Sequence, residues 1–361
     1  MSPFNDSARL ILIIATCLVI NARSSSAQSL SPISSEPAES VKDQILNVYS
    51  LTKSADNPSQ YSEIDSRCTA ILKLDLSDKD RKYVNSLASW ALCRRGLTRL
   101  DLADSFLAAG NHEQSELIVE QAKSDFDQSI ARDKQRWRGH LGRGMVLTRR
   151  AQFEAALKDF QEVTRQQPDN LAGWFNQAEL QYELAHYSEA IDCYAKVIQD
   201  DPADAQAYTG RGHCQFARGD YEAALVDYEM ARQLVPLNQM AKCNCGEAER
   251  MLGHWKAAYD HYMQATKVNP LPAAYRKAAW MLATCPDKEY SRPQEALELV
   301  DQAIAMQGET LENLKTLAAA QSANGELTLA TATRERIAAM ESKTKTDSSR
   351  VAEIDSADPK R

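Results

Sequence analysis

The sequence predicts an all-α fold in which pairs of helices form a repeat array. Prolines recur 34 residues apart at Pro168, Pro202, Pro236 and Pro270. A fixed period near this length is the signature of a helical repeat. Three more columns share the phase: small residues (Gly144, Ala178, Gly212, Gly246), alanines (Ala156, Ala190, Ala224, Ala258) and aromatics (Phe160, Tyr194, Tyr228, Tyr262). Four copies in phase over residues 137–272 favour an array over a non-repetitive bundle.

Each copy fits two antiparallel helices. The small residue lets the first helix approach its partner closely, and the alanine does the same in the second helix. The aromatic residue lies four positions after the alanine, on the same face, and fills the gap between copies. Proline cannot continue a helix and therefore ends the copy. Because one pair cannot bury its apolar face alone, neighbouring copies are expected to stack.

These columns resemble the tetratricopeptide-repeat (TPR) pattern of Trp, Leu-Gly, Tyr, Ala, Phe and Pro. One copy runs Trp174, Gln177-Ala178, Gln181, then Ala190, Tyr194 and Pro202. Where the family pattern has leucine, the four copies instead have Arg143, Gln177, Arg211 and Cys245. The resemblance implies a right-handed solenoid of roughly seven or eight units that binds other proteins.

The N-terminus predicts a targeting segment. Arg9 precedes the apolar run Leu10–Ile20, which is too short to span a bilayer, and Ser25-x-Ala27 suits cleavage before Gln28. Residues 1–27 are therefore predicted to be a signal peptide that directs the chain to the periplasm or the exterior, with an uncleaved membrane anchor as the alternative. Residues 28–40 are rich in Ser, Pro and Ala, which predicts a flexible leader.

Two atypical segments precede the regular copies. Residues 41–78 are predicted to form an imperfect first repeat, opened by a capping box at Ser40–Asp43 and continued by a helix around 61–74. Residues 79–136 predict a longer helical hairpin that turns at Gly110-Asn111. Its arms exceed the repeat length, so we expect it to protrude, either as a docking knob or as an inert extension.

The period loosens after residue 272. Residues 273–340 predict further TPR-like units, including the phrase Leu282-Ala283-Thr284-Cys285-Pro286 and a helix opened by Pro293. That phrase resembles a bacterial TPR variant found near the end of an array. Residues 341–361 are polar with few apolar anchors, which predicts disorder.

No catalytic, cofactor or metal site is predicted. The six histidines are scattered along the chain, and neither a nucleophile elbow nor a phosphate loop is present. Cys243 and Cys245 are two apart on a helix and point to different faces, so they make a poor metal clamp and fit better as buried thiols. Cys68 and Cys93 fall on neighbouring predicted helices and are the best candidates for a disulfide.

Charge gives little indication of a nucleic-acid partner. The chain carries −8 overall, although a basic run spans its first regular copy. That run is Arg132, Lys134, Arg136, Arg138, Arg143, Arg149 and Arg150. A solvated, charged helix face is favoured over an acidic ligand because the protein as a whole is acidic.

In the TPR family the first helix of each unit lines a concave groove that binds extended peptides. By that resemblance the predicted groove residues are Arg138, Arg149, Phe175, Asn176, Glu179, Tyr182, His213, Phe216, Asn244, Glu247 and Arg250. Asn176 and Asn244 resemble part of the asparagine ladder of O-linked N-acetylglucosamine transferases, but Gly142 and Gly210 interrupt it. The clamp that co-chaperone TPR domains use for a C-terminal carboxylate is unmatched, because Leu141, Phe175, Thr209 and Cys243 occupy its places.

The sequence thus predicts a non-enzymatic interaction scaffold that binds an extended segment of another protein, without cofactor, nucleic acid or transmembrane span in the mature chain. Two alternatives stay open. One is an accessory subunit that recruits substrate to an envelope polysaccharide or glycosyl-transfer enzyme. The other is a purely structural array. The partner and the oligomeric state are not predicted.

Overall fold

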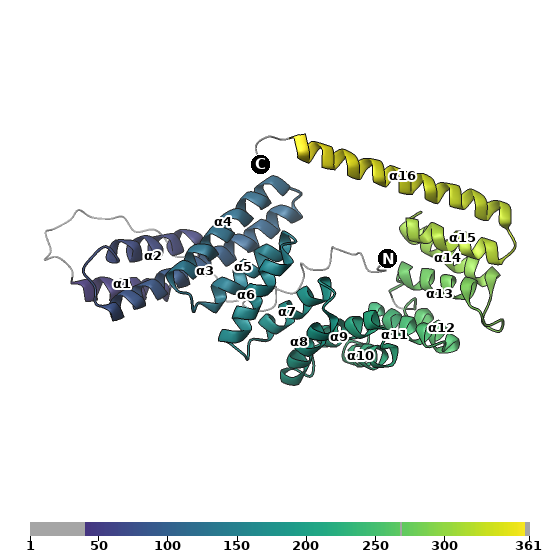
Figure 1. Cartoon of the computed structure of the whole chain (residues 1–361), viewed down its shortest axis with the longest axis horizontal. Helices are drawn as coiled ribbons and strands as arrows, with labels where there is room; N and C mark the ends of the chain where they lie inside the picture. The colour runs from purple at the N-terminus through teal and green to yellow at the C-terminus, as the bar shows by residue number, and fades with distance from the viewer. Residues whose placement is uncertain (1–39, 268, 358–361) are drawn as a thin grey trace.

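A computed structural model describes residues 40–267 and 269–357, with side chains described as far as residue 343. Within these residues the chain forms sixteen α-helices and no strand. In Figure 1 the helices follow one another along a bent row, from α1 and α2 at one end to α15 at the other. No helix among them is both long and apolar enough to cross a membrane. The predicted signal peptide and nearly all of the leader lie outside the described residues.

The N-terminal unit contains α1 (Val41–Thr52) and α2 (Pro58–Ile71), packed on the first half of α3 (Asp78–Ala108). The capping box forms, because the Ser40 hydroxyl accepts a hydrogen bond from the Asp43 N–H at the start of α1. Val48, Ile64 and Val84 are among the buried residues that join the three helices in one core.

The hairpin of α3 and α4 (His112–Arg132) differs from the protruding knob expected from its length. The first half of α3 packs on α2, whereas its second half packs on α4 and α5 (Trp137–Arg149). The tip is also held, because Arg149 forms an ion pair with Asp104 and Arg150 forms one with Glu120. The long helix α3 therefore serves two successive units, and this shared role accounts for its extra length.

The four regular copies pair α5 with α6 (Phe153–Gln166), α7 (Leu171–Glu183) with α8 (Tyr187–Asp200), α9 (Ala205–Arg218) with α10 (Tyr221–Leu234), and α11 (Gln239–Met251) with α12 (Trp255–Gln264). The turn inside each pair needs one residue with positive φ. Glycine supplies it in two copies, at Gly219 and Gly253, and alanine in the other two, at Ala151 and Ala185. Alanine is strained in this conformation.

The repeat columns form the core. All four alanines of the second-helix column are fully buried, and the four aromatic residues are at most 2% exposed. The glycines make close approach possible: a Cβ on Gly212 would lie 2.7 Å from the Tyr228 ring, and one on Gly210 would lie 2.3 Å from the Tyr194 ring. Each of these tyrosine rings thus packs against glycine backbone of a first helix.

Two further pairs complete the array. They are α13 (Pro272–Thr284) with α14 (Pro293–Gln307), and α15 (Leu311–Ala323) with α16 (Leu327–Ala357). The tail differs from the predicted disorder, since α16 continues as a helix to Ala357 (Figure 1). The segment Leu327–Ala357 contains neither glycine nor proline, the residues that most often end a helix. The helix that packs on α15 can therefore continue to Ala357.

The first helices form the inner layer of the bend. Contacts join α3 to α5, α7 to α9, α11 to α13 and α13 to α15, whereas the second helices α6, α8, α10 and α12 have no such contacts of comparable extent with one another in the described chain. Helices on the inner side of a curved array are closer to each other than those on the outer side. The predicted groove residues lie on this inner layer, on α5, α7, α9 and α11.

The suggested Cys68–Cys93 disulfide is absent from the structure, where both thiols are free and buried. Cys68 packs in the core shared by α1, α2 and α3. The Cys93 sulfur instead lies 2.9 Å from the Ser129 hydroxyl of α4. Cys68 therefore faces the interface of α2 with α1 and α3, whereas Cys93 faces the interface of α3 with α4. The order of the helices in the sequence does not show which of these interfaces a cysteine faces.

Candidate functional site

The inner face carries a repeated bond between a first-helix side chain and the buried tyrosine of the same copy. The Tyr194 hydroxyl donates to Glu179, and the Tyr262 hydroxyl donates to Glu247 at 2.8 Å. The residue equivalent to both glutamates in the copy between them is His213, whose Nδ1 lies 2.8 Å from the Tyr228 hydroxyl. Three predicted groove residues are therefore engaged within their own copies.

Glu179 and Glu247 occupy equivalent positions but differ in electrostatics. Burial raises the pKa of Glu179 above its ordinary value of 4.5, and the nearby Glu183 adds to that effect. Burial acts on Glu247 in the same direction, but Lys277 and Arg250 outweigh it and hold the pKa of Glu247 at about 2. Lys277 and Arg250 lie 3.1 and 2.7 Å from its carboxylate oxygens. Glu247 is thus a fixed anion, whereas Glu179 is a poorly solvated acid.

Rings on successive first helices lie close together along the inner layer. Tyr182 of α7 and His213 of α9 have ring centroids 6.4 Å apart, and both side chains are partly exposed. Phe216 follows one turn later on α9 and contacts Tyr221 with centroids 5.1 Å apart. Phe175 is different, since it is buried against Tyr194 and contributes to the core rather than to the surface.

The two predicted ladder asparagines differ in their surroundings. The Asn176 amide donates to the Ala172 carbonyl at 2.7 Å, within its own helix. Asn244 is 6% exposed, and its Nδ2 has no hydrogen-bond partner among the described residues. A buried amide donor left in this way costs on the order of 1–3 kcal/mol. At the interrupting positions, aromatic rings cover the backbone, with Phe126 against Gly142.

The basic run is largely neutralised by acids of the same chain. Arg143 bridges Asp127 and Asp159 at 3.0 and 2.8 Å, and Arg149 pairs with Asp104. Arg138 is exposed and stacks on Trp137, with its guanidinium 4.2 Å from the ring centroid. Among the predicted groove arginines, Arg149 and Arg250 thus take part in internal ion pairs.

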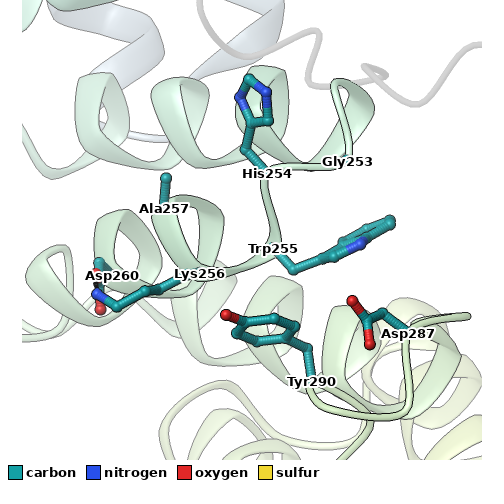
Figure 2. A pocket seen from close by; sticks show the side chains of 8 residues that line it. All are labelled: Gly253, His254, Trp255, Lys256, Ala257, Asp260, Asp287 and Tyr290. Atoms are coloured by element: carbon teal, nitrogen blue, oxygen red, sulfur yellow. Dashed lines mark hydrogen bonds and ion pairs between the residues drawn. The ribbon is translucent and has the colours of Figure 1, made fainter.

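Two surface hollows lie away from the predicted groove residues. One, of about 440 Å³, opens at the start of α12, where Trp255 faces Asp287 and Tyr290 of the loop between α13 and α14 (Figure 2). The other, of about 680 Å³, lies between α1 and the start of α3. Lysines and apolar side chains line it, among them Leu46, which is 62% exposed. Neither of these two hollows includes a groove residue expected from the sequence.

A further cluster was missed from the sequence. Glu229, Cys245 and His261 offer ligand atoms that all lie within 4.8 Å of one another. They come from α10, α11 and α12, spaced 16 residues apart along the chain. A search limited to pairs on one helix could not find them. A detectable signal was the column at the leucine position, where two of the four copies carry an amide or a thiol in place of arginine.

The geometry defines an all-α solenoid whose inner helices carry polar and aromatic side chains. A family described as "Tetratricopeptide repeat" matches residues 100–170, 141–184 and 175–238. Residues 100–238 thus consist of tetratricopeptide repeats. This architecture is a protein-interaction scaffold and is generally non-catalytic.

Several solved structures are similar to parts of this chain at low sequence identity. One is Pseudomonas aeruginosa pilF, at 15% identity and TM-score 0.48, covering 62% of this chain and 96% of that one. Another is YrrB, titled a TPR protein with an unusual peptide-binding site, at 18% identity and TM-score 0.44, covering 53% and 96%. MamA from Desulfovibrio magneticus RS-1 has 17% identity and TM-score 0.42, covering 48% and 94%. No curated protein matches the sequence.

Proposed function

We propose that this scaffold binds an extended segment of another protein along the inner face of α7, α9 and α11. The observation that carries the proposal is the row of partly exposed rings formed by Tyr182, His213 and Phe216. Tyr182 and His213 are 6.4 Å apart. In an extended peptide, side chains two residues apart lie on the same face, separated by roughly 6.6 Å. The ring spacing therefore suits alternate side chains of an extended ligand.

Amides beside the rings support the same ligand class. An asparagine side chain both donates and accepts, so it can hold a peptide backbone regardless of sequence. Asn176 and Asn244 flank the row on α7 and α11, and the Asn244 amide has an unused donor among the described contacts. Asn176 is partly exposed and within reach of a ligand, whereas the Asn244 Nδ2 is buried beneath the surface.

The test is capture of a partner by the full chain from a native extract, followed by affinity measurement with the captured protein. We expect the combination of Asn176→Ala and Phe216→Ala to weaken binding by tenfold or more, about 1.4 kcal/mol, while the array stays folded. The matched control is Val226→Ala, which truncates a side chain that is 67% exposed on the second helix α10. Equal affinity of the double variant and the wild type would refute the groove assignment.

The captured protein also distinguishes the alternatives. An enzyme of polysaccharide or sugar transfer that still binds the double variant would favour an accessory subunit docked on another surface. If Glu179→Lys leaves partner binding unchanged, the result favours a purely structural array. The free energy of unfolding must be unchanged too, because Glu179 also accepts the Tyr194 hydrogen bond and its loss could alter folding.

We propose in addition that residues 1–27 direct export and are removed. The support is the order of Arg9, the apolar run Leu10–Ile20 and the small residues before Gln28. Fractionation of cells expressing the full chain, with N-terminal mass spectrometry, tests this. A mature protein that begins at Gln28 is expected, and an intact N-terminus in the cytosolic fraction would contradict it.

A further inference from the structure

Glu229, Cys245 and His261 converge between the third and fourth regular copies, from the three successive helices α10, α11 and α12. The His261 Nε2 lies 3.5 Å from the Glu229 Oε1, and the Cys245 sulfur completes a triangle within 4.8 Å. Cys245 is fully buried, while the side chains of His261 and Glu229 are 15% and 26% exposed. The cluster therefore opens to solvent on the side of Glu229.

The array itself shows what this place does in other copies. Three periods earlier, the equivalent residues are Asp127, Arg143 and Asp159. There the Arg143 guanidinium lies between the two carboxylates, at 3.0 and 2.8 Å. One period earlier, Arg211 and Asp227 form the same pair at 2.7 Å. In these two copies the position thus holds a cation, between two carboxylates in the first copy and beside one in the third.

In the fourth copy the arginine is replaced by Cys245 and the second carboxylate by His261. The fourth copy therefore has no counterpart of the Arg143 guanidinium at this position. A carboxylate, a thiol and an imidazole face one another there instead. Arg232 partly compensates, because it donates to the Glu229 Oε2 and lies within hydrogen-bonding reach of Cys245. The other carboxylate oxygen, Oε1, is the one directed at His261.

We infer that Glu229, Cys245 and His261 bind a divalent metal ion of the zinc class. Thiolate, imidazole and carboxylate are the three donor types that zinc takes in proteins, and three protein ligands leave a fourth position for water. With bonds of about 2.1 Å and a tetrahedral angle, zinc separates a nitrogen and an oxygen ligand by about 3.4 Å. The Nε2 and Oε1 atoms are 3.5 Å apart.

The imidazole of His261 binds a metal through the Nε2 lone pair, and Nε2 is the ring atom that faces Glu229. Binding through sulfur takes the thiolate of Cys245, with its proton released to solvent. The bound ion would fasten α10, α11 and α12 together beside Asn244 and Glu247.

Cobalt(II) is the probe, because it substitutes for zinc and reports thiolate ligation through a charge-transfer band. Titration of the reduced full chain is expected to give one cobalt per chain with this band, and zinc is expected to displace it. Cys245→Ala should abolish the band and weaken binding by more than tenfold. Cys243→Ala is the matched control, since Cys243 is equally buried on the same helix but faces a different core cluster.

A second variant separates metal loss from misfolding. Combining Cys245→Arg with His261→Asp reproduces the side chains of the first copy at these two positions, and Glu229 supplies the remaining carboxylate. We expect this protein to fold, as followed by circular dichroism, and to lack the cobalt band. A wild-type protein without the band, or a band that survives in Cys245→Ala, would overturn the assignment. Loss of the band in Cys243→Ala alone would also overturn it.

Discussion

Glu179 and Glu247 provide a paired test of how the inner face is stabilised. They occupy equivalent positions two periods apart, and each accepts a hydrogen bond from the tyrosine of its own copy. Only Glu247 also pairs with Lys277 and Arg250. Replacing each glutamate with glutamine keeps the acceptor and the shape while removing the charge. The two substitutions should therefore have opposite effects at neutral pH.

The magnitude follows from the pKa of Glu247. It falls from 4.5 in an ordinary setting to about 2 in the fold, because Lys277 and Arg250 outweigh burial. A shift of this size corresponds to about 3 kcal/mol of stability. Since the folded pKa is depressed, that contribution is present above about pH 4.5 and is lost as the pH falls toward 2. Glu247→Gln should lower the free energy of unfolding by about 3 kcal/mol at neutral pH.

Glu179 has the opposite sign. Burial raises its pKa, so its contribution is present below the unfolded value of 4.5 and is lost as the pH rises through the folded pKa. Glu179→Gln should therefore raise the free energy of unfolding at neutral pH, with the gain vanishing in acid. Urea unfolding followed by circular dichroism measures both variants, and hydrogen exchange of α7 and α11 amides reports the local effect.

A loss of stability in both variants that does not change with pH would refute this reasoning. It would mean that the tyrosine hydrogen bond to a charged acceptor, which both positions share, dominates over the neighbouring cations. An equal gain in both would show that Lys277 and Arg250 do not compensate for the burial of Glu247.

Three further predictions concern stability and use the same urea assay. Ala185→Gly should stabilise the chain by about 0.5–1 kcal/mol, because glycine adopts the positive φ of this turn without strain. Gly219→Ala should destabilise the chain by a similar amount. The cost there is the backbone strain alone, since an added Cβ would meet no atom within 4 Å. Gly142→Ala should cost about 1–3 kcal/mol, because its Cβ would lie 2.2 Å from the Phe126 ring. Asp125→Asn should cost about 3 kcal/mol or more, since the buried carboxylate of Asp125 holds two arginines of α3.

The repeat core was predictable because it is local and periodic. The alanine and aromatic columns follow from the 34-residue period, and each residue in them packs against its own copy or the next one. Helix starts were predictable for the same reason, since Ser40 bonds to an N–H three residues away. No long-range information is needed for contacts of this kind, and the family and the all-α solenoid followed from them.

The remaining features depend on neighbours that the period does not specify. The sharing of α3 between two units, the separation of Cys68 from Cys93 and the continuation of α16 are set by tertiary packing or by the absence of a stop signal. The groove residues were assigned by position alone. Position does not reveal that Glu179 accepts from Tyr194, or that Phe175 is buried.

The departures from the family pattern proved more informative than the matches. The family pattern has leucine where this chain has Arg143, Gln177, Arg211 and Cys245. Instead Arg143 and Arg211 form ion pairs with buried aspartates, and Gln177 accepts from Thr164 at 3.2 Å. A buried charge persists only where partners compensate for its desolvation, so each departure requires specific neighbours on an adjacent helix.

That requirement changes how the inner face should be probed. Residues that bond to the tyrosine column, such as Glu179 and Glu247, affect the stability of their copies in either direction, so a substitution there alters folding before it alters binding. The rings of Tyr182 and Phe216 are partly exposed and pack mainly against other rings, so truncating them removes surface with little loss of internal polar bonding. Binding experiments are therefore interpretable at the rings and amides, and stability experiments at the glutamates.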